Sequence, residues 1–249
     1  MAIIPISDLP QSAALSGAEL FPIVQGGTTK HVEVSSFVGG VNNKASGTYS
    51  TVAGGRSNTA SGGCSTIAGG GDNTASDGYS TVGGGYYNIA SGYYSTIVGG
   101  GYNCASGFSS AIVGGTRHSA SGSNSFIGSG YINCAIGNFS TVGGGCINCA
   151  DGNYSTIAGG RSNTASGTYS TVAGGRSNTA SGSCSGILGG RTNIASHANS
   201  FIIGTGITSV SSNMLHANTL YLSAAALPTS DPNQPGVVWN DSGTLKISQ

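Results

Sequence analysis

Small apolar residues, polar residues and glycines recur along this chain with a period of fifteen residues. Alanine occupies one position of the repeat eleven times, with no insertion between copies: Ala45, Ala60, Ala75, Ala90, Ala105, Ala120, Ala135, Ala150, Ala165, Ala180 and Ala195. When this alanine is counted as column one, column six is always serine and column eight is always valine or isoleucine. The consensus row is A-S-G-x-x-S-T-V/I-x-G-G-x-x-N-x. Such a fixed period indicates a repeat architecture.

The nearly invariant columns are spaced by two, which is the period of a β-strand. Columns six, eight and ten form one such series, and columns fourteen, one and three form the other, so both series are expected to point inward. The alternation breaks at columns four to five and eleven to thirteen, where glycine at or beside the break can supply the positive φ of a turn. Each strand and turn is too short for a crossover helix. The sequence therefore predicts an all-β fold, a parallel β-roll or β-solenoid of eleven 15-residue repeats.

A second apolar stripe falls on the opposite parity and is expected to face outward. Column nine holds only Ala, Gly, Val, Leu or Ile, and column fifteen includes Ile89, Cys104, Cys134, Cys149 and Ile194. The inward residues are nearly all small, so a single coil buries little apolar surface. The free energy gained from that burial is smaller than the cost of ordering the backbone. We therefore expect a homotrimer, intertwined or side by side, whose chains cover the stripe around one axis.

The charge balance and composition limit the classes of partner that this chain is expected to bind. Eight Lys and Arg balance eight Asp and Glu, so we expect neither nucleic acid nor an anionic membrane surface as a partner. No apolar run approaches the roughly 20 residues of a membrane span, and residues 1–5 lack the features of a secretory signal. We expect assembly in a cytoplasm, reduced thiols for the six cysteines, and no cofactor.

The run G-x-x-N-x-A-x-G-x-x-S resembles the head repeats of trimeric autotransporter adhesins. That resemblance implies left-handed parallel β-rolls that associate in threes. The chain departs from the family in its period, which is fifteen rather than fourteen residues, and in the asparagine of column fourteen. The secretion signal, coiled-coil stalk and membrane anchor of those adhesins have no counterpart here, which disfavours a bacterial surface adhesin.

The two flanks resemble parts of phage particles. Residues 6–34 are similar to the N-terminal segment of tailed-phage fibre proteins, and residues 227–247 to terminal modules of phage virion proteins. Each flank predicts a hairpin, one around Gly26-Gly27 and one with strands 237–239 and 244–247 around a turn at 240–243. We divide the chain into an attachment segment (1–33), a repeat shaft (34–209, full repeats 45–209) and a C-terminal β module (210–249).

These resemblances imply a non-enzymatic virion fibre, mounted on a tail, baseplate or capsid, that binds other virion proteins through its N-terminal segment. A glycan depolymerase tailspike is one alternative, but such enzymes need two nearby carboxylates. Asp72 and Asp77 are the closest pair and fall in different corner columns. An ice-binding β-solenoid is the other alternative, because column seven is threonine in seven of eleven rows; Ala111, Phe126, Gly186 and Phe201 interrupt it.

Candidate metal ligands are sparse. Cys146 and Cys149 form a C-x-x-C without a second pair at zinc spacing, and we interpret the cysteines of column fifteen as stacked small apolar residues. His118 replaces the column-fourteen asparagine and His197 the column-three glycine. We expect no metal site.

Tyrosines mark the candidate receptor site. Ten of eleven tyrosines fall in the repeats, all at corner columns. Aromatic rings beside small polar residues suit binding of a host surface glycan, whereas a ladder of stacked rings is the structural alternative. The candidate receptor-binding residues are Tyr79, Tyr86, Tyr87, Tyr93, Tyr94, Tyr102 and Phe108.

Overall fold

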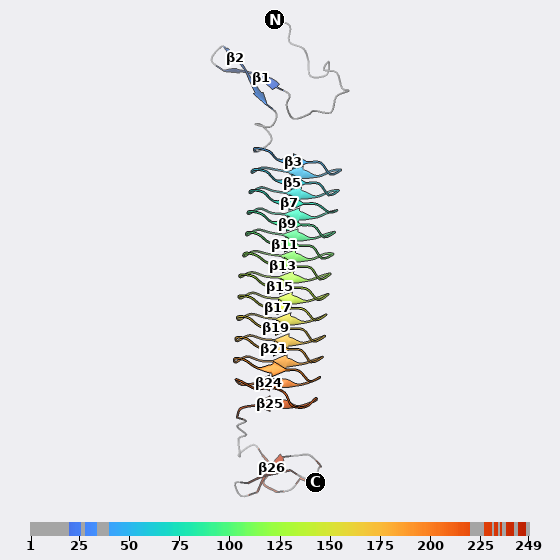
Figure 1. The fold of residues 1–249 in the computed structure, drawn as a ribbon, viewed down its shortest axis with the longest axis vertical. Helices are drawn as coiled ribbons and strands as arrows, with labels where there is room; N and C mark the ends of the chain where they lie inside the picture. The colour runs from blue at the N-terminus through green and yellow to red at the C-terminus, as the bar shows by residue number, and fades with distance from the viewer. Residues whose placement is uncertain are drawn as a thin grey trace.

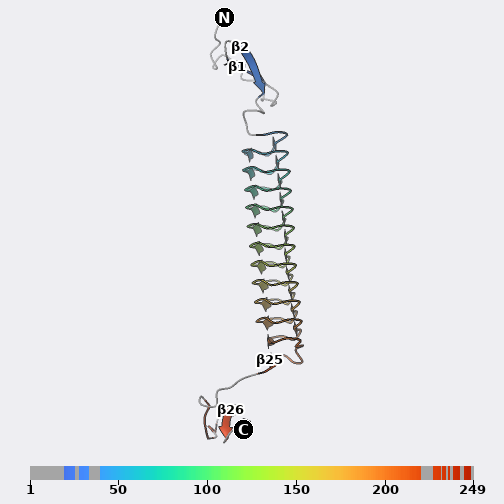
Figure 2. The ribbon, with the colours of Figure 1, turned by 90° about the vertical axis from the view of Figure 1, so that its left-hand side faces the viewer.

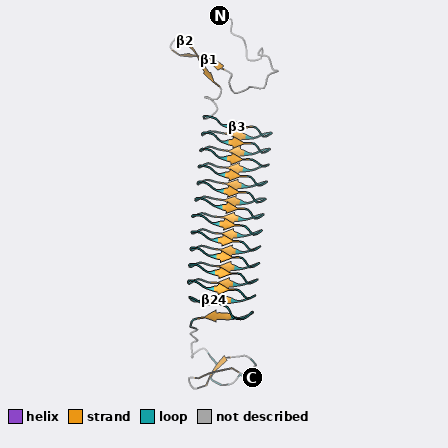
Figure 3. Ribbon diagram, in the orientation of Figure 1, coloured by secondary structure: helices purple, strands orange, loops and turns teal. Residues whose placement is uncertain are grey.

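The fifteen-residue rows fold into successive coils of a parallel β-solenoid, which we call rungs. The computed structural model describes residues 20–25, 28–33, 40–219, 227–230, 232–233, 235, 238–241 and 244–247. All regular structure in these residues is β, and the rungs stack along one axis (Figure 1). The predicted all-β parallel solenoid is confirmed. Most of each rung is turn rather than strand, as Figure 3 shows.

Two parallel sheets run the length of the stack. Columns seven and eight supply a 12-stranded sheet that β25 completes: β4 (Thr51–Val52), β6 (Thr66–Ile67), β8 (Thr81–Val82), β10 (Thr96–Ile97), β12 (Ala111–Ile112), β14 (Phe126–Ile127), β16 (Thr141–Val142), β18 (Thr156–Ile157), β20 (Thr171–Val172), β22 (Gly186–Ile187), β24 (Phe201–Ile203) and β25 (Leu215–Ala217). Columns fifteen and one supply an 11-stranded sheet: β3 (Lys44–Ala45), β5 (Thr59–Ala60), β7 (Thr74–Ala75), β9 (Ile89–Ala90), β11 (Cys104–Ala105), β13 (Ser119–Ala120), β15 (Cys134–Ala135), β17 (Cys149–Ala150), β19 (Thr164–Ala165), β21 (Thr179–Ala180) and β23 (Ile194–Ala195). Figure 2 shows the successive rungs side on.

The register follows the repeat until the last rung. Ile97 pairs with Ile112, fifteen residues on, but Phe201 pairs with Leu215, only fourteen residues on. The sheet therefore continues to Ala217, one rung beyond residue 209, where the sequence pattern places the end of the repeats. One residue is missing from the turn that follows column nine in the last row. After this deletion the residues no longer fall in the fifteen-residue columns by which the other rungs are recognised.

The interior is thin and half polar. Columns one and eight form the apolar core, in which side chains such as Ile127 have no exposed surface. Columns six and fourteen add buried serines and asparagines, and the column-three glycines such as Gly107 are also buried. The inward assignment is wrong for column ten, however, because the strand ends at column eight. A Cβ built on Gly69, Gly99 or Gly174 would meet nothing within 4 Å.

The glycine columns serve different purposes. In column eleven glycine supplies the expected positive φ, for example 90° at Gly100. In column three it allows close approach, because a Cβ on Gly107 would lie 2.1 Å from the carbonyl oxygen of Gly122 in the next rung. Columns five and thirteen also have positive φ but carry other residues, such as Tyr79 at 57° and Ile147 at 57°. Glycine therefore supplies the positive φ in column eleven, whereas other residues supply it in columns five and thirteen.

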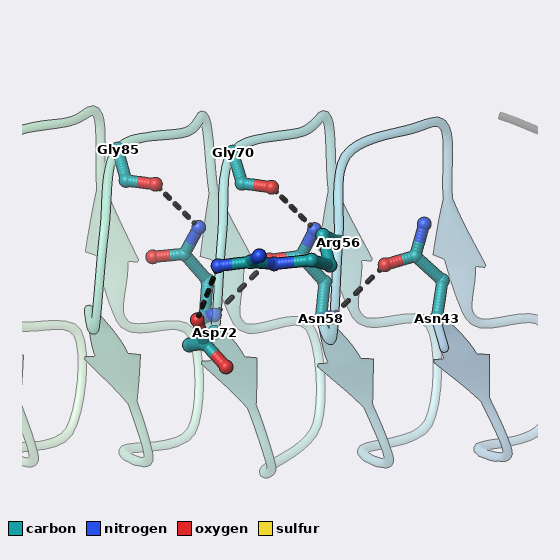
Figure 4. Close-up of polar contacts among 7 residues, drawn as sticks. Asn43, Arg56, Asn58, Gly70, Asp72 and Gly85 are labelled. Carbon is teal, nitrogen blue, oxygen red and sulfur yellow. Dashed lines mark hydrogen bonds and ion pairs between the residues drawn. The ribbon is translucent and has the colours of Figure 1, made fainter. Parts of the chain in front are cut away.

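A ladder of buried asparagines closes one side of the stack (Figure 4). The Nδ2 group of Asn58 donates to the carbonyl oxygens of Gly54 (3.1 Å) and of Gly70 in the next rung (3.0 Å). Its backbone N–H donates to Oδ1 of Asn43 in the preceding rung, at 3.0 Å. Repetition of this pattern satisfies the column-ten carbonyls, such as that of Gly54, which have no other donor in the described residues.

Both predicted terminal hairpins are confirmed. β1 (Leu20–Gln25) and β2 (Thr28–Glu33) pair antiparallel, with Gln25 opposite Thr28. β26 (Val238–Asp241) and β27 (Thr244–Ile247) also pair antiparallel. Asn240 and Asp241, which the sequence places in the turn, belong instead to β26, and the rest of the predicted turn lies outside the described residues.

Candidate functional site

The aromatic candidates form two clusters rather than one. Tyr79, Tyr93, Tyr94 and Phe108 occupy the turns of columns four and five, which we call the first edge. There Tyr79 stacks on Tyr94 with ring centroids 5.0 Å apart, and Tyr93 lies parallel to Phe108 at 6.1 Å.

Tyr86, Tyr87 and Tyr102 occupy the turns of columns twelve and thirteen, which we call the second edge. Tyr87 stacks on Tyr102 at 5.3 Å, and Tyr86 packs edge-on against Tyr87 at 4.3 Å. The two edges lie at opposite ends of each short strand. The structure therefore does not bring the seven candidates into a single site.

Stacking limits what these rings can offer a ligand. A pyranose binds an aromatic residue through a free ring face, but stacking covers one face each of Tyr79 and Tyr94 at the first edge and of Tyr87 and Tyr102 at the second. Hydrogen bonding to Tyr87 raises the pKa of Tyr86, and partial burial raises the pKa of Tyr93. Both phenols remain protonated near neutral pH and can donate hydrogen bonds. Receptor binding by these residues stays a prediction.

A third aromatic group escaped the sequence reasoning. Phe139, Tyr154 and Tyr169 stack in consecutive rungs of the first edge, with centroids 5.0 and 4.8 Å apart. The signal was present, because all three residues occupy column five.

The two candidate carboxylates lie apart. Asp72 and Asp77 occupy the turns at opposite ends of β7. Asp72 Oδ2 is 3.9 Å from a guanidinium nitrogen of Arg56 (Figure 4), whereas Asp77 Oδ1 accepts the N–H of Gly78 at 2.7 Å. They are separate corner residues, as predicted.

The histidines and cysteines are equally dispersed. His118 is buried in the asparagine ladder, where its Nδ1 accepts the N–H of Asn133 at 3.0 Å. His197 is in column three, next to the first edge, and its Nδ1 lies 2.9 Å from the hydroxyl oxygen of Ser209. Cys134 and Cys149 are register partners in neighbouring rungs, and all six cysteines are free thiols. Within the described ranges, no three His, Cys, Asp or Glu side chains group as metal ligands.

The outward faces of the two sheets also carry exposed apolar side chains. Column nine points outward, as predicted, and Val98 and Leu188 there are 57% and 59% exposed. The open backbone of the column-ten glycines lies directly beside these side chains. On the other sheet, Ile89 and Ile194 of column fifteen are also exposed. The described part of the chain has no helix that could cross a membrane.

No protein-family model matches this sequence, and no curated protein matches it. The fold and the outer surfaces are therefore the observations from which its function is inferred.

Proposed function

We propose that this chain is a structural virion fibre protein whose solenoid forms the rigid shaft of a homotrimer. The fibre is mounted on a tail, baseplate or capsid, is assembled in the host cytoplasm and contributes to attachment to the host surface. The observation that carries the proposal is the outward surface of columns nine and ten, where exposed apolar side chains adjoin a line of glycines.

The column-ten glycines favour the proposal that a second chain packs on this surface. Gly69, Gly99 and Gly174 do not have positive φ, and a Cβ on any of them would meet nothing within this chain. Glycine at these positions loses more backbone entropy on folding than alanine would, and a single chain provides no compensation for it. Close approach of another backbone requires glycine. The exposed side chains of column nine would become buried in the same contact.

The stack itself suits a shaft. Register pairing runs without a break from Lys44 to Ala217. At about 4.8 Å per rung the stack spans roughly 50 Å. Backbone hydrogen bonds link each rung to the next along both sheets and the turns, as in the bond from Thr59 N–H to the Asn73 carbonyl at 2.8 Å. A continuous ladder of this kind resists bending.

The flanks support a place in a virion through their resemblance to phage fibre termini. Residues 1–33 are the segment proposed to bind other virion proteins, and β1 and β2 within it form a hairpin. The chain should therefore be detected by mass spectrometry in purified virions, at a copy number divisible by three. Its absence from particles that are otherwise complete would refute the virion assignment.

Catalysis and ice binding are tested separately. Incubation with host surface polysaccharide should show binding without new reducing ends, and ice recrystallisation should be unaffected. Release of oligosaccharides would instead establish a depolymerase, and inhibition of recrystallisation would establish ice binding.

Glycan recognition is tested one edge at a time. Replacing Tyr87 and Tyr102 with serine alters only the second edge, and replacing Tyr79 and Tyr94 alters only the first. One of these double variants should bind cells less well while its oligomeric mass stays unchanged. If neither does, the rings are a structural ladder and recognition lies elsewhere.

A further inference from the structure

Two thiols face each other across neighbouring rungs near the middle of the stack. Cys134 of β15 and Cys149 of β17 are register partners in the 11-stranded sheet. Both are partly exposed, and the alanine that follows each of them points into the core. Adjacent strands lie about 4.8 Å apart, which is within the Cα separation of about 4.4–6.8 Å that a disulfide spans.

The two thiols of this pair differ in acidity. The thiol of Cys149 donates a hydrogen bond to the sulfur of Cys134, which lowers the pKa of Cys134 to about 7 and raises the pKa of Cys149. Partial burial and the negative charge of Asp151 oppose the shift at Cys134 without cancelling it. Near neutral pH, Cys134 is therefore the more acidic thiol of the pair and supplies the nucleophilic thiolate fraction, while Cys149 remains a thiol beside it.

We propose that Cys134 and Cys149 form a redox-active dithiol that hydrogen peroxide converts into a disulfide between two rungs. In the first step the Cys134 thiolate attacks one peroxide oxygen, the O–O bond breaks, and Cys134 becomes a sulfenic acid as hydroxide leaves. In the second step the Cys149 sulfur attacks the sulfenic sulfur, the S–O bond breaks, and the leaving hydroxide takes the Cys149 proton to form water. Two thiols lose two electrons, and the peroxide is reduced to two molecules of water once the first hydroxide is protonated.

The disulfide would link β15 covalently to β17, which are the seventh and eighth strands of the sheet counted from β3. Solenoids lose structure rung by rung because each rung contacts only its neighbours. A covalent bond at mid-stack would keep these two rungs linked when fraying from either end reaches them. The pair lies within one chain, so this inference does not depend on the trimer.

Cys104 provides a matched control in the same column. Its register neighbours are Ile89 and Ser119, whereas those of Cys134 are Ser119 and Cys149. The two thiols therefore share a serine neighbour and differ in having isoleucine or cysteine on the other side. Cys149→Ile gives Cys134 the same two kinds of register neighbour as Cys104, in the opposite order along the stack, and Ile89→Cys gives Cys104 a thiol partner.

The first experiment measures alkylation of the folded protein by iodoacetamide at pH 7, resolved by peptide mass spectrometry. A pKa of about 7 gives Cys134 roughly fifteen times the thiolate fraction of an ordinary cysteine. The lower nucleophilicity of a more acidic thiol reduces that advantage about five-fold. Cys134 should therefore react about three times faster than Cys104. Cys149→Ile should equalise the two rates, and Ile89→Cys should change the alkylation rate at position 104. Equal rates at Cys134 and Cys104 in the parent would overturn the proposal.

The second experiment treats the same proteins with hydrogen peroxide. The parent should lose two hydrogen atoms in a peptide pair that joins Cys134 to Cys149 within one chain, and a reducing agent should reverse the change. Cys149→Ile should instead leave a sulfenic acid at Cys134 that dimedone traps. Peroxide treatment that yields no bond between these residues would refute the redox pair even if the alkylation rates differ.

Discussion

Asn148 offers the sharpest test of how the stack is held together. Its Nδ2 group donates to the carbonyl oxygens of Gly144 at 2.9 Å and Gly160 at 3.0 Å. Its Oδ1 accepts the backbone N–H of Asn163 in the next rung at 3.0 Å. Asn148→Ala removes all three hydrogen bonds from a fully buried position.

The magnitude follows from which groups lose their partners. The Gly160 carbonyl keeps the N–H of Cys146 at 2.9 Å, whereas the Gly144 carbonyl and the Asn163 N–H have no other partner in the described residues. Leaving a buried polar group unpaired costs about 1–3 kcal/mol. Two such groups predict a loss of about 2–6 kcal/mol, or a fall in melting temperature of about 4 °C or more.

Hydrogen exchange followed by mass spectrometry is the appropriate assay, because rungs open locally. Exchange should accelerate in residues 144–165 and stay unchanged in rungs near the N-terminal end of the stack. Asn153→Ala is the matched control. Its Oδ1 also accepts a backbone N–H, that of Asn138 at 2.9 Å, but at an exposed turn where water can replace it. That change should cost less than about 0.5 kcal/mol. If the two variants lose equal stability, the buried ladder is not what supports the rungs.

Four further predictions concern the core, the turns and the outer face. His118→Asn should stabilise the protein by about 1–2 kcal/mol, because Nε2 has no partner in the described chain and an amide there regains the ladder's donors. Burial lowers the pKa of His118, so the parent should lose stability as pH falls below about 6.5, and its deficit relative to the asparagine variant, followed in melts at several pH values, should widen. Ile127→Asp should unfold the surrounding rungs in circular dichroism melts, whereas Ile127→Val should cost only about 1 kcal/mol, because this side chain has no exposed surface. Ile147→Asn should raise the melting temperature, since relief of a β-branched residue at φ 57° is worth about 1 kcal/mol; an unchanged melt would mean that the turn carries no strain. Val113→Asp should lower the oligomeric mass in light scattering more than Thr116→Asp, and a monomeric parent at micromolar concentration would refute the trimer.

The fifteen-residue period and the two-residue alternation of the sequence were sufficient to predict much of the fold. Columns one, three, six, eight and fourteen were predicted inward and are buried, because a strand's alternation is set by backbone geometry alone. Stacking of Cys134 on Cys149 follows from the same period, since rows of equal length put equal columns in register. The division of the aromatic residues between two edges was also readable from their columns, because columns four to five and twelve to thirteen belong to different turns.

Other features depended on contacts between rungs, which no single row contains. The open surroundings of the column-ten glycines appeared only once the strands proved to be two residues long. Tyr79 and Ile147 adopt positive φ although neither residue favours it, because their backbone N–H groups donate hydrogen bonds to carbonyl oxygens of the preceding rung. The sequence pattern did not show the twelfth rung because one deleted residue moves its residues out of the fifteen-residue columns. The strand of that rung, β25, still pairs in parallel with β24. Sequence periodicity specifies which residues share a column, whereas the hydrogen bonds and steric gaps between columns arise only when the rungs stack.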